Sequence, residues 1–208
     1  MAEIIYLVRH GEAESNEQKY FAGHLDAQLT SLGRKQSLLL KKRLSHEKIG
    51  FAFCSDLSRA KGTLEALTLP CPVEFTPLLR EKSYGELEGV RWGDEEEKFA
   101  AHHSDPFLAA PGGESFASMQ ARVVEFFQQR ILAASQKEVL VVSHHGPIVA
   151  LACHLLSIPL EKWRVLRMGN CGLSILTRED GMWRLKLWNS LSQSGLESFK
   201  PLFKPGKN

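Results

Sequence analysis

Two uninterrupted apolar segments, each followed by a histidine and a glycine, constrain the fold of this chain more than any other feature. Ile4 to Val8 precedes Arg9-His10-Gly11-Glu12, and Val139 to Val142 precedes Ser143-His144-His145-Gly146. Short apolar runs rich in Val and Ile are typical of strands that are covered on both faces. Ligands of open α/β sheets bind beyond the carboxyl ends of such strands. The pattern therefore predicts two buried strands that present histidines, with an arginine beside the first, to an anion.

A third apolar segment adds a second cation to this expected site. Phe51 to Ser55 has the composition of another short strand, and the residues after it favour a helix with Arg59 in its first turn. Arginine stays charged at any working pH, and its planar fork of donors matches phosphate oxygens. We expect Arg9, Arg59, His10 and His144 to converge on one pocket.

Composition narrows the class of protein. The chain has 208 residues, 43% of them hydrophobic, and a net charge of +2. This is enough for a sizeable core, while the dispersed basic residues disfavour nucleic-acid binding. No apolar run approaches the roughly 18 residues of a membrane span, and no secretory signal is visible. The four cysteines lack a C-x-x-C pair, which favours reduced thiols and a cytoplasmic location.

Periodicity and capping residues predict the remaining elements. Helices are expected over Thr30 to His46, Phe116 to Ala133 and Ile148 to Leu156, and Ser115 would cap the second of these. Strands are expected at Val73 to Phe75, Leu173 to Leu176 and Trp183 to Trp188. The last two strands would form a hairpin. This alternation predicts a three-layer α/β/α sandwich with a mostly parallel central sheet.

We expect residues 1–208 to form a single domain. Residues 90–115, with a short helix at Asp94 to Lys98, would form an excursion that covers the site, and a polar tail would begin at about residue 192. The late strands offer an edge on which a homodimer could pair.

The residue types at the expected site suit phosphoryl transfer. A neutral imidazole is a good nucleophile towards phosphorus, and neighbouring cations should lower the pKa of His10 and keep it neutral. Arg9, Arg59 and His144 are suited to stabilise the charge on the transferring group. The leaving alkoxide also needs a proton donor. Glu81 is the best candidate, and Glu12 and Glu86 are rivals on composition alone.

Leu7-Val8-Arg9-His10-Gly11-Glu12, with Asn16, resembles the signature of the histidine phosphatase superfamily in its phosphoglycerate mutase-like branch, branch 1. Further blocks resemble that family in the same order: Gly23 with Asp26-x-x-Leu29-Thr30-x-x-Gly33-x-x-Gln36, Ser55-x-Leu57-x-Arg59-Ala60-x-x-Thr63, Leu79-x-Glu81-x-x-x-Gly85-x-x-Glu88-Gly89, Gly113-Glu114-Ser115 and Val142-Ser143-His144. The ordered set is far more specific than any one block.

The resemblance implies a phosphoglycerate mutase-like fold and a role for each matching residue. His10 would be the phosphorylated nucleophile and Glu81 the proton donor, while Arg9, Arg59 and His144 would hold the phosphoryl group. The resemblance also implies substrate or phosphate contacts at Asn16, Gly23 and His145. The family uses no metal and no organic cofactor, and its partner here would be a small phosphorylated metabolite.

The chain departs from the family pattern beside the pocket. Ala13 stands where Thr is common, His145 where Gly is common, and Ile148-Val149 where an arginine often follows. These departures leave the substrate open.

Three rival functions remain from the sequence. A phosphoglycerate mutase would need extra basic residues for a carboxylate, and only Arg91, Lys98 and Arg122 are obvious candidates. A metallohydrolase would be centred on His144-His145 and His102-His103, near Asp105. A non-catalytic phosphate-binding protein would have no need of all five residues His10, Arg9, Arg59, Glu81 and His144.

Overall fold

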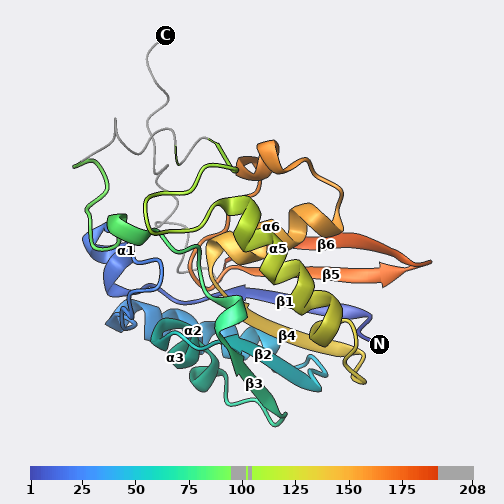
Figure 1. Ribbon diagram of the computed structural model, residues 1–208. Coiled ribbons are helices and arrows are strands. Elements are labelled where there is room, and N and C mark those ends of the chain that lie inside the picture. Colours follow the sequence, from blue (N-terminus) through green and yellow to red (C-terminus); the bar gives the residue numbers. More distant parts are fainter. Residues whose placement is uncertain (95–101, 103–104, 192–208) are drawn as a thin grey trace.

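A six-stranded mixed sheet forms the centre of the computed structural model, which describes residues 1–94, 102 and 105–191 (Figure 1). The strands are β1 (Ile4–Arg9), β2 (Phe51–Ser55), β3 (Val73–Thr76), β4 (Glu138–Ser143), β5 (Leu173–Glu179) and β6 (Met182–Ser190). Their order in the sheet is β3-β2-β4-β1-β5-β6. The first four in this order run parallel; β5 is antiparallel to β1, and β6 is antiparallel to β5. The expected sandwich with a mostly parallel sheet is confirmed.

Helices cover both faces of the sheet. The α-helices are α1 (Glu14–Gln18), α2 (Ser31–Leu44), α3 (Ser58–Leu67), α5 (Phe116–Phe126) and α6 (His145–Leu155). Short turns of other helical types are η1 (Pro77–Leu79), η2 (Gly85–Leu87), η3 (Phe127–Ile131) and η4 (Leu160–Val165). Helices α5 and α6 lie on one face, and α2 and α3 lie on the other (Figure 1).

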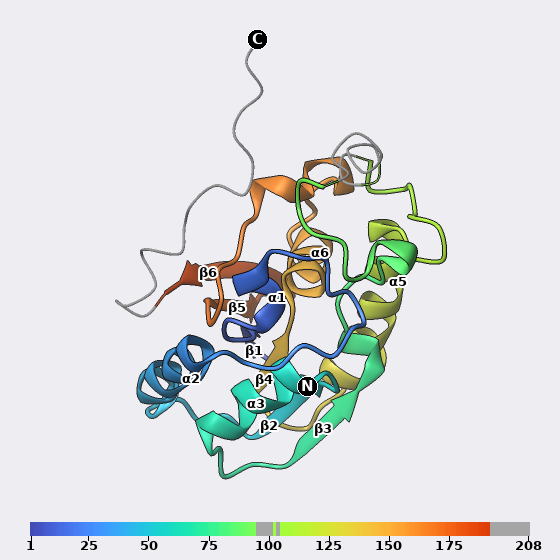
Figure 2. The same cartoon turned by 90° about the vertical axis from the view of Figure 1, so that its left-hand side faces the viewer.

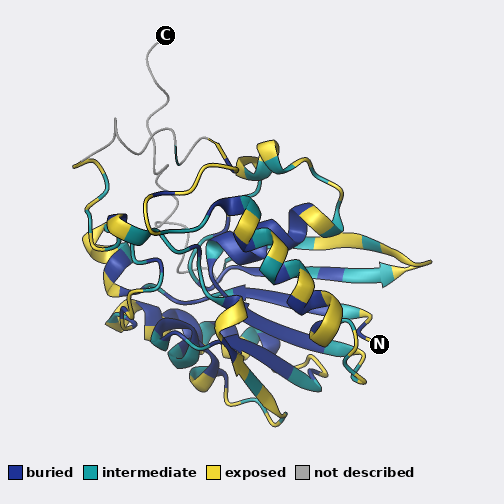
Figure 3. Cartoon of the chain, in the orientation of Figure 1, coloured by how far each residue is buried: buried dark blue, intermediate teal, exposed yellow. Residues whose placement is uncertain are grey.

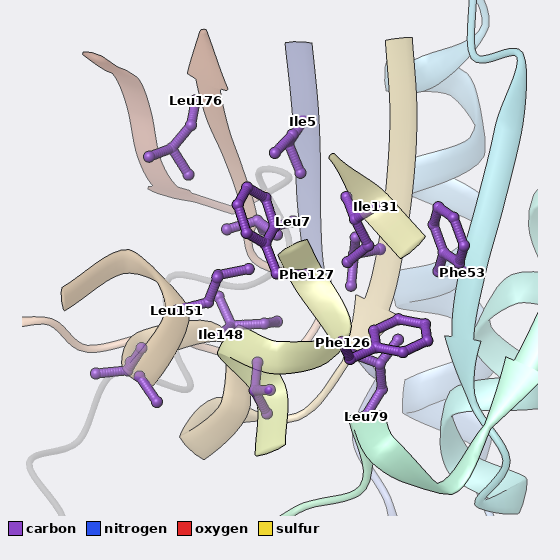
Figure 4. Close-up of a cluster of buried hydrophobic side chains, with 14 of the residues drawn as sticks. Ile5, Leu7, Phe53, Leu79, Phe126, Phe127, Ile131, Ile148, Leu151 and Leu176 are labelled. Atoms are coloured by element: carbon purple, nitrogen blue, oxygen red, sulfur yellow. The ribbon is translucent and has the colours of Figure 1, made fainter. Parts of the chain in front are cut away.

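The central strands are buried along most of their length, and each face of the sheet has its own core (Figure 3). Ile5 and Leu7 of β1 pack with α5 and α6, whereas Tyr6 and Val8 pack with α2 and α3. Figure 4 shows Ile5 and Leu7 among Phe127 and other side chains of the first core. Successive side chains of a strand point to opposite faces, so two covered faces require an unbroken apolar run.

Local signals position the helices as expected. Thr30 and Ser115 cap α2 and α5, since their side chains accept hydrogen bonds from Gly33 N and Ser118 N. The expected long helix after Ser115 continues beyond Phe126 only as a π-helical turn, η3. The late hairpin is longer than expected and turns at Asp180-Gly181, which both have positive φ.

One helix boundary was predicted wrongly, and it matters for the site. Helix α6 begins at His145 with His144 as its N-cap, three residues before Ile148, although Pro147 does lie in the first turn, as the sequence predicts. Pro147 occupies the first turn, where no backbone N–H is needed. The first turn of α6 therefore lies directly beside the second site histidine.

Part of the sequence-based prediction lies outside the described residues. This holds for most of the expected helix at Asp94 to Lys98, for part of the excursion at 90–115, and for the tail from residue 192. Within the described part of the chain, no helix has the length and apolar character needed to span a bilayer.

The packing of α2 yields a stability prediction with a matched control. Leu40→Ala should lower the free energy of unfolding by about 2–5 kcal/mol, because the side chain fills the second core; Leu40 is 2% exposed. Leu38→Ala on the same helix removes a side chain that is 54% exposed and should change it by less than about 0.5 kcal/mol. Urea unfolding measures both, and equal losses would contradict this orientation of the helix.

Candidate active site

Residues that follow three neighbouring parallel strands meet at one end of the sheet. β1 and β4 pair with Arg9 opposite Ser143, so His10 and His144 leave the sheet side by side. Their ring centroids are 5.0 Å apart. β2 pairs with the other edge of β4, and helix α3 after it carries Arg59. In Figure 2, which views the molecule from another side, α1 and the chain after it cross in front of the sheet.

His10 is held as a neutral imidazole with one nitrogen available. Its Nδ1 lies 2.6 Å from the carbonyl oxygen of Gly11. A carbonyl can only accept, so Nδ1 carries the proton and Nε2 keeps its lone pair. Burial, followed by the charges of Arg59 and Arg9, holds the pKa of His10 well below its ordinary value. This is the protonation state that a histidine nucleophile needs.

His144 is fixed in the opposite tautomer. Arg59 Nε donates to His144 Nδ1 at 3.2 Å, so the proton lies on Nε2, which is 2.8 Å from the hydroxyl oxygen of Ser55. Burial and the charge of Arg59 hold the pKa of His144 well below its ordinary value. With both ring nitrogens engaged, this arrangement does not favour the metal reading of His144.

Arg59 is anchored by the loop between α1 and α2. Its Nη1 and Nη2 donate to the carbonyls of Leu25 and Gly23, each at 2.8 Å. Gly23 has a φ of +48°, and a Cβ there would lie 2.2 Å from Glu88 Oε1. A guanidinium has five N–H groups, so these contacts leave two for a ligand. The expected backbone N–H contact near Gly23 stays a prediction; what the structure adds is that the Gly23 carbonyl holds Arg59.

Arg9 has an unsatisfied donor beside His10. Its Nη1 donates to the carbonyl of Met168 at 2.6 Å, but its buried Nε has no partner among the described residues. Burial lowers the pKa of Arg9, and the nearby Glu81 carboxylate raises it. Unpaired buried donors are costly, so an anion that accepts from this group would be stabilised.

Glu81 lies at the N-terminus of α6. Its Oε2 accepts from Gly146 N at 3.1 Å and its Oε1 from Lys82 N at 2.8 Å. A Cβ on Gly146 would lie 2.1 Å from Glu81 Oε1, which explains the glycine after the histidine pair. Glu86 is exposed, and Glu12 Oε1 accepts from Thr30 Oγ1 at 2.8 Å. The geometry therefore favours Glu81 over its two rivals.

Arg122 anchors the Glu81 loop, a role that the sequence did not reveal. It donates to the carbonyls of Leu78, Arg80 and Glu81 at 2.8–3.0 Å. It also donates to both oxygens of Glu114, at 3.1 and 2.6 Å. Arg122 is one of the three basic side chains that the sequence offers for the carboxylate of a mutase substrate. Its five hydrogen bonds within the protein make that use wrong for this arrangement, and no local motif links helix α5 to this loop.

Asn16 is oriented by a second asparagine, Asn170, which the sequence alone does not mark as part of the site. Asn16 Oδ1 accepts from Ala13 N and from Asn170 Nδ2, each at 3.0 Å. Asn170 Nδ2 also lies 3.2 Å from the carbonyl of His10. The shared oxygen fixes which end of the Asn16 amide is the donor. Asn170 lies in the turn before β5, where no motif marks it.

A small pocket opens beside Glu81. It is lined by Glu81, Lys82, Tyr84, His102, Asp105, Pro106, Phe116, His145, Gly146 and Trp163. Burial lowers the pKa of His145 to about 3, so this ring is neutral. His145 thus lines the pocket beside Glu81, and its contact with a substrate stays a prediction. His103 is outside the described residues.

The electrostatics of the two histidines can be measured directly. By NMR, His10 and His144 should stay neutral well below pH 6.5, and Arg59→Met should raise the pKa of His10 because a nearby cation is lost.

The unfolded chain binds these protons near pH 6.5 while the folded chain does not, so the free energy of unfolding should fall as the pH drops below about 6.5. An ordinary titration of His10 would contradict the geometry.

Comparison with known proteins identifies the family. The profile of the histidine phosphatase superfamily (branch 1) matches residues 5–191. A probable phosphatase of Schizosaccharomyces pombe is 31% identical, with 73% of each chain covered. A probable phosphoglycerate mutase, GpmB, of Serratia proteamaculans is also 31% identical, over 88% of this chain and 89% of that one.

A solved structure supports the same assignment. The structure of a putative α-ribazole-5'-P phosphatase from Escherichia coli matches with a TM-score of 0.83 and 27% identity, over 91% of this chain and 97% of that one. The ordered blocks, the geometry of His10, Arg59 and His144, and these matches agree: the chain belongs to the histidine phosphatase superfamily, branch 1.

Proposed function

We propose that the protein hydrolyses a small phosphate monoester through a phosphohistidine intermediate on His10. The observation that carries this proposal is the neutral His10 ring, whose Nε2 lone pair is free. The charges of the buried Arg59 and the partly buried Arg9 both act on this ring. Relatives that are named phosphatases support hydrolysis as the reaction class.

The first half-reaction transfers the phosphoryl group to the enzyme. Nε2 of His10 attacks phosphorus, and the bond from phosphorus to the ester oxygen breaks. Glu81, in its protonated form, gives its proton to that oxygen, so the alcohol leaves neutral. Arg9 Nε and the remaining N–H groups of Arg59 take up the charge on the equatorial oxygens. His144, whose Nε2 donates to Ser55 Oγ, accepts from Arg59 Nε and so orients that guanidinium.

The second half-reaction regenerates the enzyme. The Glu81 carboxylate takes a proton from water, and the resulting hydroxide attacks phosphorus as the bond to Nε2 breaks. Inorganic phosphate leaves, Glu81 is protonated again, and His10 returns to its neutral tautomer. One carboxyl group thus serves as acid and then as base.

Phosphoglycerate mutase is the second candidate, because several relatives carry that name. Three basic side chains were expected to hold a carboxylate in a mutase. Arg122 donates its hydrogen bonds to Glu114 and to the carbonyl of Glu81. Arg91 is exposed, and Lys98 lies outside the described residues. These positions favour hydrolysis. A coupled assay with 3-phosphoglycerate and 2,3-bisphosphoglycerate distinguishes hydrolysis from mutase activity. A separate test addresses the metallohydrolase: activity that EDTA does not change would exclude it.

The substrate and the location follow the same proposal. The partner would be a small phosphorylated metabolite, whose alcohol part lies in the pocket beside Glu81. A cytoplasmic location is supported by the four cysteines, which are all free thiols.

Loss of the nucleophile gives the first test. His10→Ala should lower kcat for p-nitrophenyl phosphate by at least about 10³-fold, because no covalent intermediate can form. The phosphohistidine label, which is stable to alkali and labile to acid, should also disappear. His46→Ala, at an exposed histidine away from the site, is the matched control and should behave like the wild type. Persistent turnover in His10→Ala would refute the mechanism.

Loss of the proton donor gives a different signature. Glu81→Gln should lower kcat for alkyl phosphates by about 10²–10⁴-fold, because their alkoxides need protonation. p-Nitrophenolate leaves without help, so this variant should release a burst of p-nitrophenol and accumulate phosphorylated His10. Glu86→Gln at an exposed glutamate is the control. A burst in Glu86→Gln, with normal turnover in Glu81→Gln, would assign the role of proton donor to Glu86 instead.

A further inference from the structure

Gln36 is a buried polar side chain that the proposed mechanism does not use. It is 3% exposed and lies on α2, on the side that faces the loop after the nucleophile. Its Oε1 accepts a hydrogen bond from Glu12 N at 2.9 Å. A backbone N–H can only donate, so the side-chain atom that faces it must be the amide oxygen. Glutamine is mostly an exposed residue, and this one directs its acceptor at a single backbone group.

The N–H that Gln36 holds belongs to the peptide unit that orients His10. The carbonyl of Gly11 and the N–H of Glu12 lie in one plane and point in opposite directions. That carbonyl accepts from His10 Nδ1 at 2.6 Å. Gln36 therefore holds one side of a rigid plane whose other side keeps the proton of the nucleophile on Nδ1.

Helix α2 also approaches this peptide unit with its backbone. Gly33 and Gln36 are three residues apart and so lie on one face of the helix. A Cβ on Gly33 would lie 2.0 Å from the carbonyl oxygen of Glu12, and a Cβ on Gly11 would lie 2.6 Å from the carbonyl oxygen of Gly33. In the block Gly33-x-x-Gln36, the glycine thus permits the close approach and the glutamine supplies the acceptor.

The peptide units on either side have anchors of their own. Gly11 N donates to Thr63 Oγ1 at 2.9 Å, and Thr30 N donates to the Glu12 carbonyl at 3.0 Å. Loss of the Gln36 acceptor would thus leave the loop in place but free one plane to rotate, which a glycine tolerates. If the Gly11 carbonyl turned away, the imidazole Nδ1–H of the nucleophile would lose its acceptor.

We infer that Gln36 is a positioning residue for the nucleophile: it holds the Gly11–Glu12 peptide unit so that the His10 proton stays on Nδ1 and the lone pair on Nε2. The hydrogen bond to Gln36 also polarises the peptide unit, which strengthens the bond from its carbonyl to the imidazole. The inference rests on the proposed phosphatase function and adds a side chain that keeps the nucleophile in its reactive tautomer.

Gln36→Met removes the acceptor and keeps a side chain of similar length and helix propensity. In protein labelled with ¹⁵N-histidine, NMR correlations within the ring show which nitrogen carries the proton. His10 of the wild type should be the Nδ1–H tautomer, and Gln36→Met should show a large share of the Nε2–H tautomer. In rapid-quench experiments with p-nitrophenyl phosphate, the rate of His10 phosphorylation should fall about 10–100-fold, as expected for a misplaced reactant. Competitive inhibition by inorganic phosphate should change little, because Arg9 and Arg59 keep their contacts.

Three variants separate this role from a general effect on the fold. Gln36→Glu keeps an acceptor for the Glu12 N–H and should restore the Nδ1–H tautomer. Lys35→Met places the same new side chain at an exposed position of α2 and should behave like the wild type. Leu40→Ala removes a buried side chain of α2 and should lower stability without changing the tautomer of His10. If Gln36→Met does not fold, Gln36→Leu replaces it.

Several outcomes would overturn the inference. A wild-type His10 in the Nε2–H tautomer does so without any variant. An unchanged tautomer and phosphorylation rate in Gln36→Met do so as well, and so does an equal change of tautomer in Leu40→Ala. The tautomer is measured without substrate, so its result is independent of the reaction. A wild-type enzyme that neither turns over phosphate esters nor becomes phosphorylated on His10 refutes the phosphatase proposal instead.

Discussion

The parallel pairing of β1 with β4 is the constraint on which the site depends. Because Arg9 lies opposite Ser143, the residue after each strand emerges at the same level of the sheet. That pairing sets the 5.0 Å separation of the His10 and His144 rings. A shift by one residue would move every apolar side chain of β1 to the wrong core, so the cores on both faces of the sheet also hold the two histidines together.

Burial then decides the protonation states. The same packing that places His10 and His144 beside Arg59 removes water from around them, and both effects disfavour a second proton on either ring. The cost of burying the cations is offset by carbonyl oxygens of Gly23, Leu25 and Met168. The site thus combines fixed positive charge with a neutral imidazole, the combination that suits phosphoryl transfer.

Much of this could be predicted from the sequence, because the signals are local. The apolar runs predicted β1, β2 and β4, and the resemblance to a family supplied the residues that follow them. The start of α6 was predicted wrongly, since Pro147 is compatible with several positions in a first turn. Arg122 and Asn170 were missed as positioning residues, because their partners lie 41 and 154 residues away in the chain.

The sequence by itself determined which elements form and which chemistry is present: two histidines and two arginines at the ends of apolar strands, with a family signature around them. Only the tertiary structure decided the tautomers of the two histidines, the position of Glu81 at the N-terminus of α6, and the carbonyl oxygens that hold Arg59. Strand and helix patterns depend on neighbours in the chain. Proton positions and ion pairs depend on which distant atoms lie within about 3–4 Å, and that is set by packing.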